Sequence, residues 1–151
     1  MAEELREIRN AMEEKDKYLV CFIGDNTFAM PIAKVAEIIG FESIEGGLDN
    51  ADLKKGVVDF AGEKISFMSL GKLFYNEKIE YTDKTCFIIT RLKEGKIAFV
   101  VKAVAEVTDF DGELIMKPSL HARRHIESYV VGVVRYKDDI IQILDVDKIL
   151  K

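Results

Sequence analysis

The feature that most constrains the fold is a stretch of sequence that occurs twice, 76 residues apart. Residues 56–74 read GVVDFAGEKISFMSLGKLF, and residues 132–150 read GVVRYKDDIIQILDVDKIL. The two copies align without a gap, so that Phe67 corresponds to Ile143. Each copy alternates apolar and polar residues around a short turn, as in a half-buried β-hairpin.

Two further blocks are repeated in the same order. Residues 28–38 correspond to residues 97–107 at an offset of 69, and residues 21–23 correspond to residues 86–88 at an offset of 65. Chance matches rarely keep block order, so the sequence predicts an internal duplication of a unit of roughly 65–75 residues. The halves should superpose with four pairs in equivalent places: Cys21 and Cys86, Val35 and Val104, Gly56 and Gly132, and Phe67 and Ile143. We also expect Phe67 and Ile143 to be buried.

Each unit offers four or five short strands and one short helical turn. A sheet this small must close or be covered to hide its edges, so the pattern predicts a mainly β fold of two small, partly closed barrels packed side by side. Residues 18–80 are expected to form the first barrel and residues 81–151 the second, with a short helix at the end of the second.

Two other segments are expected to contain helix. Residues 1–17 are mostly charged and carry a thin apolar stripe of Leu5, Ile8 and Met12, which suits either a solvated tail or a short helix docked on the body or on a partner. Residues 33–39 are expected to make a helical turn or two before Gly40 ends them.

Composition excludes several classes of function. The formal net charge of −5 argues against nucleic acid as a partner, because phosphate binding needs clustered cations. No apolar run reaches the length of about 18 residues that a spanning helix needs, and no secretory signal is present, so we expect no membrane insertion. The two cysteines do not form a disulfide framework and predict a reduced, cytoplasmic protein.

Motifs that carry chemistry are weak. His121 and His125 have the i, i+4 spacing of two metal ligands, but no Glu follows the first His and no third ligand is apparent. Asp109, Asp111 and Glu113 resemble only the start of a calcium loop and are better explained as turn residues. The sequence shows no phosphate-binding loop, nucleophile elbow or Cys-x-x-Cys motif. We therefore expect a binding module without enzymatic activity, metal or cofactor.

The ordered set of repeated motifs resembles the CheW family of bacterial chemotaxis coupling proteins. The motifs that carry the resemblance are Val35-x-Glu37-Ile38, Gly56-Val57-Val58, Tyr129-Val130-Val131-Gly132 and Leu144-Asp145-Val146-Asp147-Lys148-Ile149-Leu150. The likeness extends from about Lys17 to Leu150. It implies two five-stranded SH3-like barrels and a non-catalytic adaptor. Such an adaptor bridges the cytoplasmic tips of methyl-accepting chemoreceptors to the regulatory domain of a CheA-type histidine kinase, at membrane-associated arrays.

The resemblance also implies which surfaces bind. A receptor helix would lie in a groove between the barrels, and the kinase would bind barrel ends, strand edges and hairpins. The positions expected to form the groove are Val35, Glu37, Ile38, Ile39, Val104 and Val107. The alternative for the apolar members is that they only seal the core between the barrels.

Several polar positions depart from the family pattern. Ala61, before Gly62, stands where the family usually has Arg, and Ser69 and Lys102 stand where it often has Asp. The alternative function is therefore a divergent barrel pair that binds another protein or a small ligand outside chemotaxis.

Overall fold

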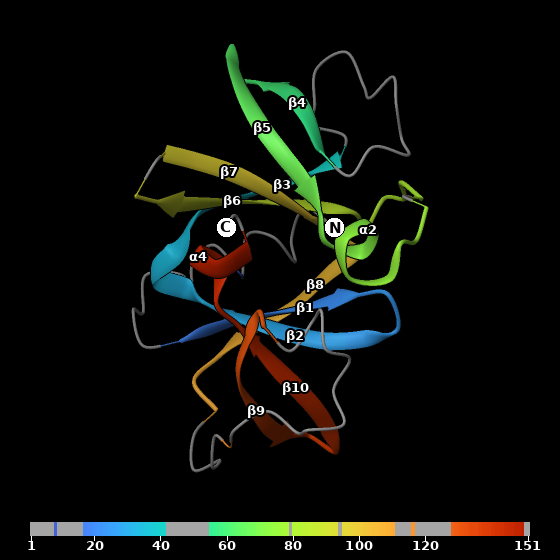
Figure 1. Ribbon diagram of the computed structural model, residues 1–151, viewed down its shortest axis with the longest axis vertical. Helices are drawn as coiled ribbons and strands as arrows, with labels where there is room; N and C mark the ends of the chain where they lie inside the picture. Colours follow the sequence, from blue (N-terminus) through green and yellow to red (C-terminus); the bar gives the residue numbers. More distant parts are fainter. Residues whose placement is uncertain are drawn as a thin grey trace.

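A computed structural model describes residues 8, 17–41, 55–78, 80–93, 95–110, 116 and 128–149, and these form a mainly β fold (Figure 1). The strands are β1 (Tyr18–Ile23), β2 (Asn26–Pro31), β3 (Val35–Gly40), β4 (Lys55–Phe60), β5 (Glu63–Ser69), β6 (Cys86–Leu92), β7 (Gly95–Val101), β8 (Ala103–Thr108), β9 (Val130–Tyr136) and β10 (Asp139–Leu144). The short helices are the 3-10 helix η1 (Ile32–Lys34), α2 (Leu70–Tyr75) and α4 (Val146–Ile149). No helix within these ranges is long and apolar enough to cross a membrane.

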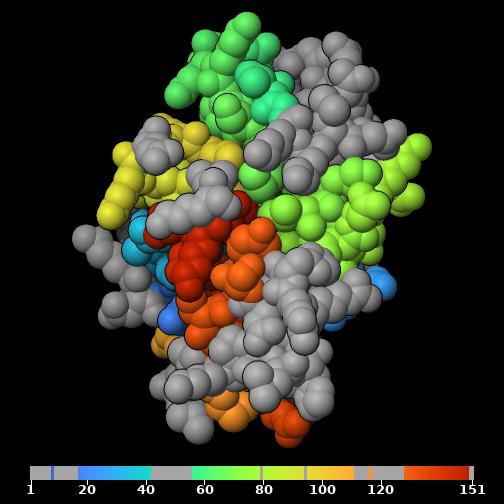
Figure 2. Space-filling view, viewed as in Figure 1, coloured from blue at the N-terminus to red at the C-terminus, as the bar shows by residue number. Residues whose placement is uncertain are grey.

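The strands form two five-stranded sheets. Sheet A has the order β8-β1-β2-β10-β9, and sheet B has the order β3-β6-β7-β5-β4. Figure 1 shows sheet B in the upper half of the molecule and sheet A in the lower half, with α4 between them, and the space-filling view from the same side shows α4 at the surface of this face (Figure 2). The expected fold of two five-stranded β units is confirmed.

The strand order shows the internal duplication directly. Replacing each strand by its counterpart in the other half, β1 by β6 through β5 by β10, converts the order of sheet A into that of sheet B. Phe67 lies opposite Gly56 in one hairpin, and Ile143 lies opposite Gly132 in the other. Phe67 and Ile143 are each 3% exposed, so their predicted equivalence and burial are both confirmed.

Each sheet nevertheless takes strands from both halves of the sequence. Sheet A joins the first-half hairpin β1–β2 to the second-half strands β8, β9 and β10, and sheet B joins β6–β7 to β3, β4 and β5. The expected assignment of residues 18–80 to one barrel and residues 81–151 to the other therefore does not match the sheets. The cause is long-range parallel pairing of β2 with β10 and of β5 with β7, which local alternation does not encode.

The strand registers correct one predicted pair. Cys21 of β1 lies opposite Val104 of β8. In the other sheet, the residue of β6 that lies opposite Val35 of β3 is Thr90. Thr90, not Cys86, thus occupies the place equivalent to Cys21, whereas the equivalence of Val35 and Val104 is confirmed. The predicted offset of 65 between these strands came from a match of only three similar apolar residues. The pairing of β1 with β2 and of β6 with β7 gives an offset of 69.

The predicted helical turn at residues 33–39 is only partly correct. The 3-10 helix ends at Lys34, and Val35 begins strand β3, which pairs with β6. β-Branched residues at positions 35, 38 and 39 fit the pleated surface of a strand better than a helix.

Three apolar clusters hold the fold together. The largest lies between the sheets and takes residues from both, including Leu19, Phe28 and Phe99. Ile8 is helical, 6% exposed, and belongs to this central cluster, while the other residues of the 1–16 segment lie outside the described ranges. Each sheet also has a small core of its own, around Phe67 in sheet B and around Ile143 in sheet A.

Candidate functional site

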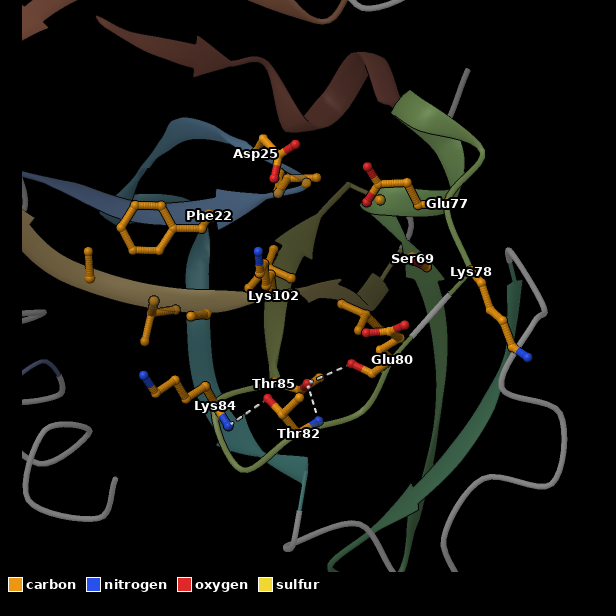
Figure 3. A pocket seen from close by; sticks show the side chains of 18 of the residues that line it. Phe22, Asp25, Ser69, Glu77, Lys78, Glu80, Thr82, Lys84, Thr85 and Lys102 are labelled. Carbon is orange, nitrogen blue, oxygen red and sulfur yellow. Dashed lines mark hydrogen bonds between the residues drawn. The ribbon is translucent and has the colours of Figure 1, made fainter. Parts of the chain in front are cut away.

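A groove with a volume of about 1280 Å³ lies where the two sheets meet (Figure 3). Sheet A contributes the end of β1, the turn after it and the start of β8. Sheet B contributes the end of β7 and Ser69 of β5, and helix α2 contributes Gly71. Residues from the 77–85 segment, which connects α2 to β6, form a further wall. The groove therefore draws on both sheets and on the connection between the two halves of the chain.

One wall of the groove is apolar. Phe22 is 38% exposed, because its neighbours Cys21 and Ile23 face the central cluster and alternation turns Phe22 outward. Val104 lines the groove while packing against the central cluster, and Ala103 and Ala105 flank it on β8. Small residues beside one exposed ring leave room for an apolar side chain of a partner.

Charged residues of both signs line the rest. The backbone N–H of Lys102 donates to the carbonyl of Phe22 at 2.9 Å, which fixes the corner between β7 and β8 against β1. The Lys102 side chain is exposed and lies near the middle of Figure 3, with Phe22 to one side and the acidic residues Glu77 and Glu80 to the other. Such a surface offers a partner both cationic and anionic contacts.

The connecting segment holds its shape through local hydrogen bonds. The backbone N–H of Thr82 donates to the Thr85 hydroxyl at 2.9 Å, and the backbone N–H of Lys84 donates to the Thr82 hydroxyl at 3.1 Å. Tyr81 stacks on Phe41 with ring centroids 4.6 Å apart, and burial raises the pKa of Tyr81 to about 12. This aromatic contact fastens the segment to sheet B.

The predicted groove residues do not all line this groove. Val35 and Ile38 are buried in the central cluster, and Ile39 is buried in the core of sheet B. The placement of Val35 and Ile38 agrees with the alternative expectation that these side chains seal the core between the barrels, whereas Ile39 belongs to the core of sheet B alone. Among the six predicted positions, Val104 lines the groove. Val107 is partly buried against the central cluster, and Glu37 is exposed on the edge strand β3.

Sequence reasoning missed Phe22, the largest apolar side chain in the groove. The signal was available, because Phe22 stands at an outward position of the strand Tyr18–Ile23, where a polar residue is the usual choice.

The positions that depart from the family pattern have clear structural settings. Ala61 and Gly62 form the turn between β4 and β5, with φ values of 51° and 79°, as a type I′ hairpin turn requires. Ser69 caps α2, its hydroxyl accepting a hydrogen bond from the backbone N–H of Lys72 at 3.2 Å. Ser69 and Lys102 both line the groove, so two of the three departures lie in the candidate site.

Neither cysteine is set up as a nucleophile. Cys21 and Cys86 are free and buried, and burial, with a smaller contribution from Cys86, raises the pKa of the Cys21 thiol to about 12. The described residues contain no group of three or more His, Cys, Asp or Glu side chains able to hold a metal ion. His121, His125, Asp111 and Glu113 lie outside the described residues.

Comparisons with known proteins agree with one another. The model of the CheW-like domain family matches residues 17–151. The chain is 22% identical over 134 residues to the chemotaxis protein CheW of Klebsiella aerogenes, covering 89% of this chain and 81% of that protein. The crystal structure of the scaffolding protein TtCheW from Thermoanaerobacter tengcongensis matches with a TM-score of 0.74 and 22% identity, covering 91% of this chain and 89% of the other.

Proposed function

The chain belongs to the CheW-like domain family, and from this premise we propose that it is a non-catalytic adaptor that couples chemoreceptors to a CheA-type histidine kinase. Its place of action is the cytoplasm, at membrane-associated receptor arrays to which its partners recruit it. The observation that carries the proposal is the groove between the two sheets.

The groove suits a helix of a receptor tip. An α-helix is about 10 Å across, and a groove volume of about 1280 Å³ is large enough to take part of one. A helix binds such a groove by placing apolar side chains, spaced three and four residues apart, against apolar wall residues. Phe22 and Val104 are those wall residues here, and Lys102 and Glu80 are within the groove to contact polar residues of the helix.

The receptor contact is tested by a matched pair of substitutions. Phe22→Asp places a charge on the apolar wall, whereas Ile140→Asp places the same charge on a side chain that is 57% exposed and does not line the groove. We expect Phe22→Asp to lose binding to a purified receptor-tip fragment and Ile140→Asp to retain it, with both variants melting as wild type does by circular dichroism. Equal binding by the two folded variants would show that the receptor does not bind in the groove.

The kinase contact is assigned to the β4–β5 hairpin. β4 is an edge strand, and Val57 on it is 59% exposed. An edge strand with an exposed apolar side chain favours docking of another protein, with polar groups at the rim of the interface. The regulatory domain of the CheA-type kinase from the same organism is the partner to titrate.

Val57→Asp should weaken that binding, while Val131→Asp, which alters a side chain of similar exposure (52%) on β9 of the other sheet, serves as the control. A loss with Val131→Asp alone would move the contact to sheet A. If neither kinase nor receptor fragments bind at protein concentrations of about 100 μM, the binding free energy is weaker than roughly −5.5 kcal/mol. That result would favour the alternative function, a divergent barrel pair that binds another protein or a small ligand outside chemotaxis.

A further inference from the structure

The two halves of the chain complete each other's sheets. Of the eight strand pairings, four join a strand of the first half to a strand of the second: β1–β8, β2–β10, β3–β6 and β5–β7. The central cluster is also built from both halves, with Phe28 and Met30 packing in the same cluster as Phe99 and Leu144. Without the second half, the first would consist of two separate hairpins and a lone strand, so neither half forms a sheet by itself.

The two halves are connected through residues 76–85, between α2 and β6. Asn76 begins this connection in a left-handed conformation, φ 53°, and its backbone N–H caps α2 by donating to the Lys72 carbonyl at 3.0 Å. The described residues that follow are mostly exposed, and the backbone N–H of Glu77 bonds back to Gly71. Asn76, at the exposed start of the connection, is therefore the position where a backbone change would separate the halves, and the Tyr81–Phe41 stacking has to break and form again between copies.

We propose that the chain exchanges halves with a second copy of itself, so that each pair of sheets in the dimer combines the first half of one copy with the second half of the other. All four pairings between halves, and the central cluster, are then the same as in the monomer, and only the conformation of the connection changes. A short linker holds its two ends at an effective concentration of about 1 mM. The monomer is therefore the dominant form at micromolar concentration, and exchange requires opening of the halves at high concentration.

Exchange bears on the candidate site because residues of the connection form one wall of the groove. Opening the connection alters that wall in both copies, and the dimer carries two grooves. A two-groove form binds a multivalent array with avidity that a monomer lacks. This inference concerns self-association and does not depend on which partner the groove binds.

The connection is tested with Asn76→Pro and Asn76→Gly. Proline holds φ near −65° and has no N–H, so it cannot adopt φ 53° or make the cap, and it favours an opened connection. Glycine adopts positive φ freely and keeps the cap, so it is the matched control. Each protein is refolded from denaturant at about 1 mM and, separately, at about 1 μM, on either side of the effective concentration.

Light scattering after gel filtration gives the result. We expect a species of twice the 17.1 kDa chain mass after refolding at the higher concentration, dominant for Asn76→Pro and minor for wild type and Asn76→Gly. An exchanged dimer persists on dilution for as long as unfolding takes, whereas a surface dimer separates at once. Monomers only, or dimers that separate at once on dilution, overturn the proposal.

A second measurement carries the test if Asn76→Pro fails to fold. Phe28→Asp and Leu144→Asp each bury an unpaired charge, one in each half, in side chains that are 0% exposed. Refolded separately, both variants should lack near-ultraviolet circular dichroism. Refolded together at about 1 mM, they should recover up to about half of the wild-type signal, because one sheet pair of each mixed dimer contains two undamaged halves. No recovery in the mixture overturns the proposal.

Discussion

Glu106 and Lys137 form an ion pair, 3.3 Å between Oε2 and Nζ, that joins β8 to the turn between β9 and β10 in sheet A. The Tyr136 hydroxyl donates a hydrogen bond to the same carboxylate. The pKa of Lys137 is raised, most by its hydrogen bond to Glu106 and next by its hydrogen bond to Tyr136. These contacts link the two edge strands of sheet A. By the duplication, the equivalent positions in sheet B are Glu37 and Ala61, so the cation of this pair has no counterpart at position 61.

Installing that cation should stabilise sheet B. Ala61→Lys is expected to raise the free energy of unfolding by about 0.2–1 kcal/mol relative to Ala61→Gln, as exposed ion pairs do at low salt. Urea titrations of both variants with and without Glu37→Gln form a double-mutant cycle. An unchanged difference in the Glu37→Gln background would show that Lys at position 61 does not pair with Glu37.

Gly56 is required by the ring that lies over it. A Cβ built on Gly56 would come within 2.5 Å of the Phe67 ring, a distance that forces the ring to move. We expect Gly56→Ala to destabilise the protein by about 1–3 kcal/mol through overpacking. Thermal unfolding should show that adding Phe67→Leu recovers part of the loss. A Gly56→Ala variant as stable as wild type would contradict the arrangement.

Val35 and Glu37 are two residues apart on β3 but lie in opposite environments. Val35 is 3% exposed in the central cluster, so Val35→Asp should unfold the protein by burying an unpaired charge. Glu37 is exposed, so Glu37→Lys should leave the melting temperature within a few degrees of wild type. Circular dichroism melts of the two variants test both expectations. A folded Val35→Asp protein would show that Val35 is a groove residue and not a core residue.

The raised pKa of Cys21 makes stability fall at alkaline pH. The thiol loses its proton near pH 9 in the unfolded chain but only near pH 12 in the folded protein, so its contribution is complete below pH 9 and declines above it. Between pH 8 and pH 10 wild type should lose on the order of 1 kcal/mol more unfolding free energy than Cys21→Ala. Urea unfolding at both pH values measures this, and equal losses in the two proteins would contradict the shift.

Local patterns predicted most elements of the fold, strand β3 excepted, but not their long-range partners. The repeat at an offset of 76 correctly matched the hairpins β4–β5 and β9–β10, because alternation and turn residues define a hairpin within about twenty residues. Besides β1, strand β2 pairs with β10, more than a hundred residues away, and this contact is reinforced by the Thr27 hydroxyl donating to Asp139 at 2.6 Å. No periodicity within a segment specifies a partner at that separation.

The candidate site was harder to predict for a related reason. Apolar residues at positions 35, 38 and 39 read equally well as groove or core, and burial between two sheets depends on how the sheets meet. Phe22 and Lys102 become neighbours because the β7–β8 corner hydrogen-bonds to β1. That contact joins the two halves of the chain, so it belongs to the topology and not to any one motif.

Interleaved sheets also determine when this protein can fold during its synthesis. Strand β3 pairs with β6, and β2 pairs with β10, so the first half leaves the ribosome with unpaired strand edges. At about 5–20 residues per second, the last 70 residues take about 4–14 s to be made. During that interval the nascent chain presents apolar edges that only its own second half can satisfy, and a chaperone that covers them would be most useful then.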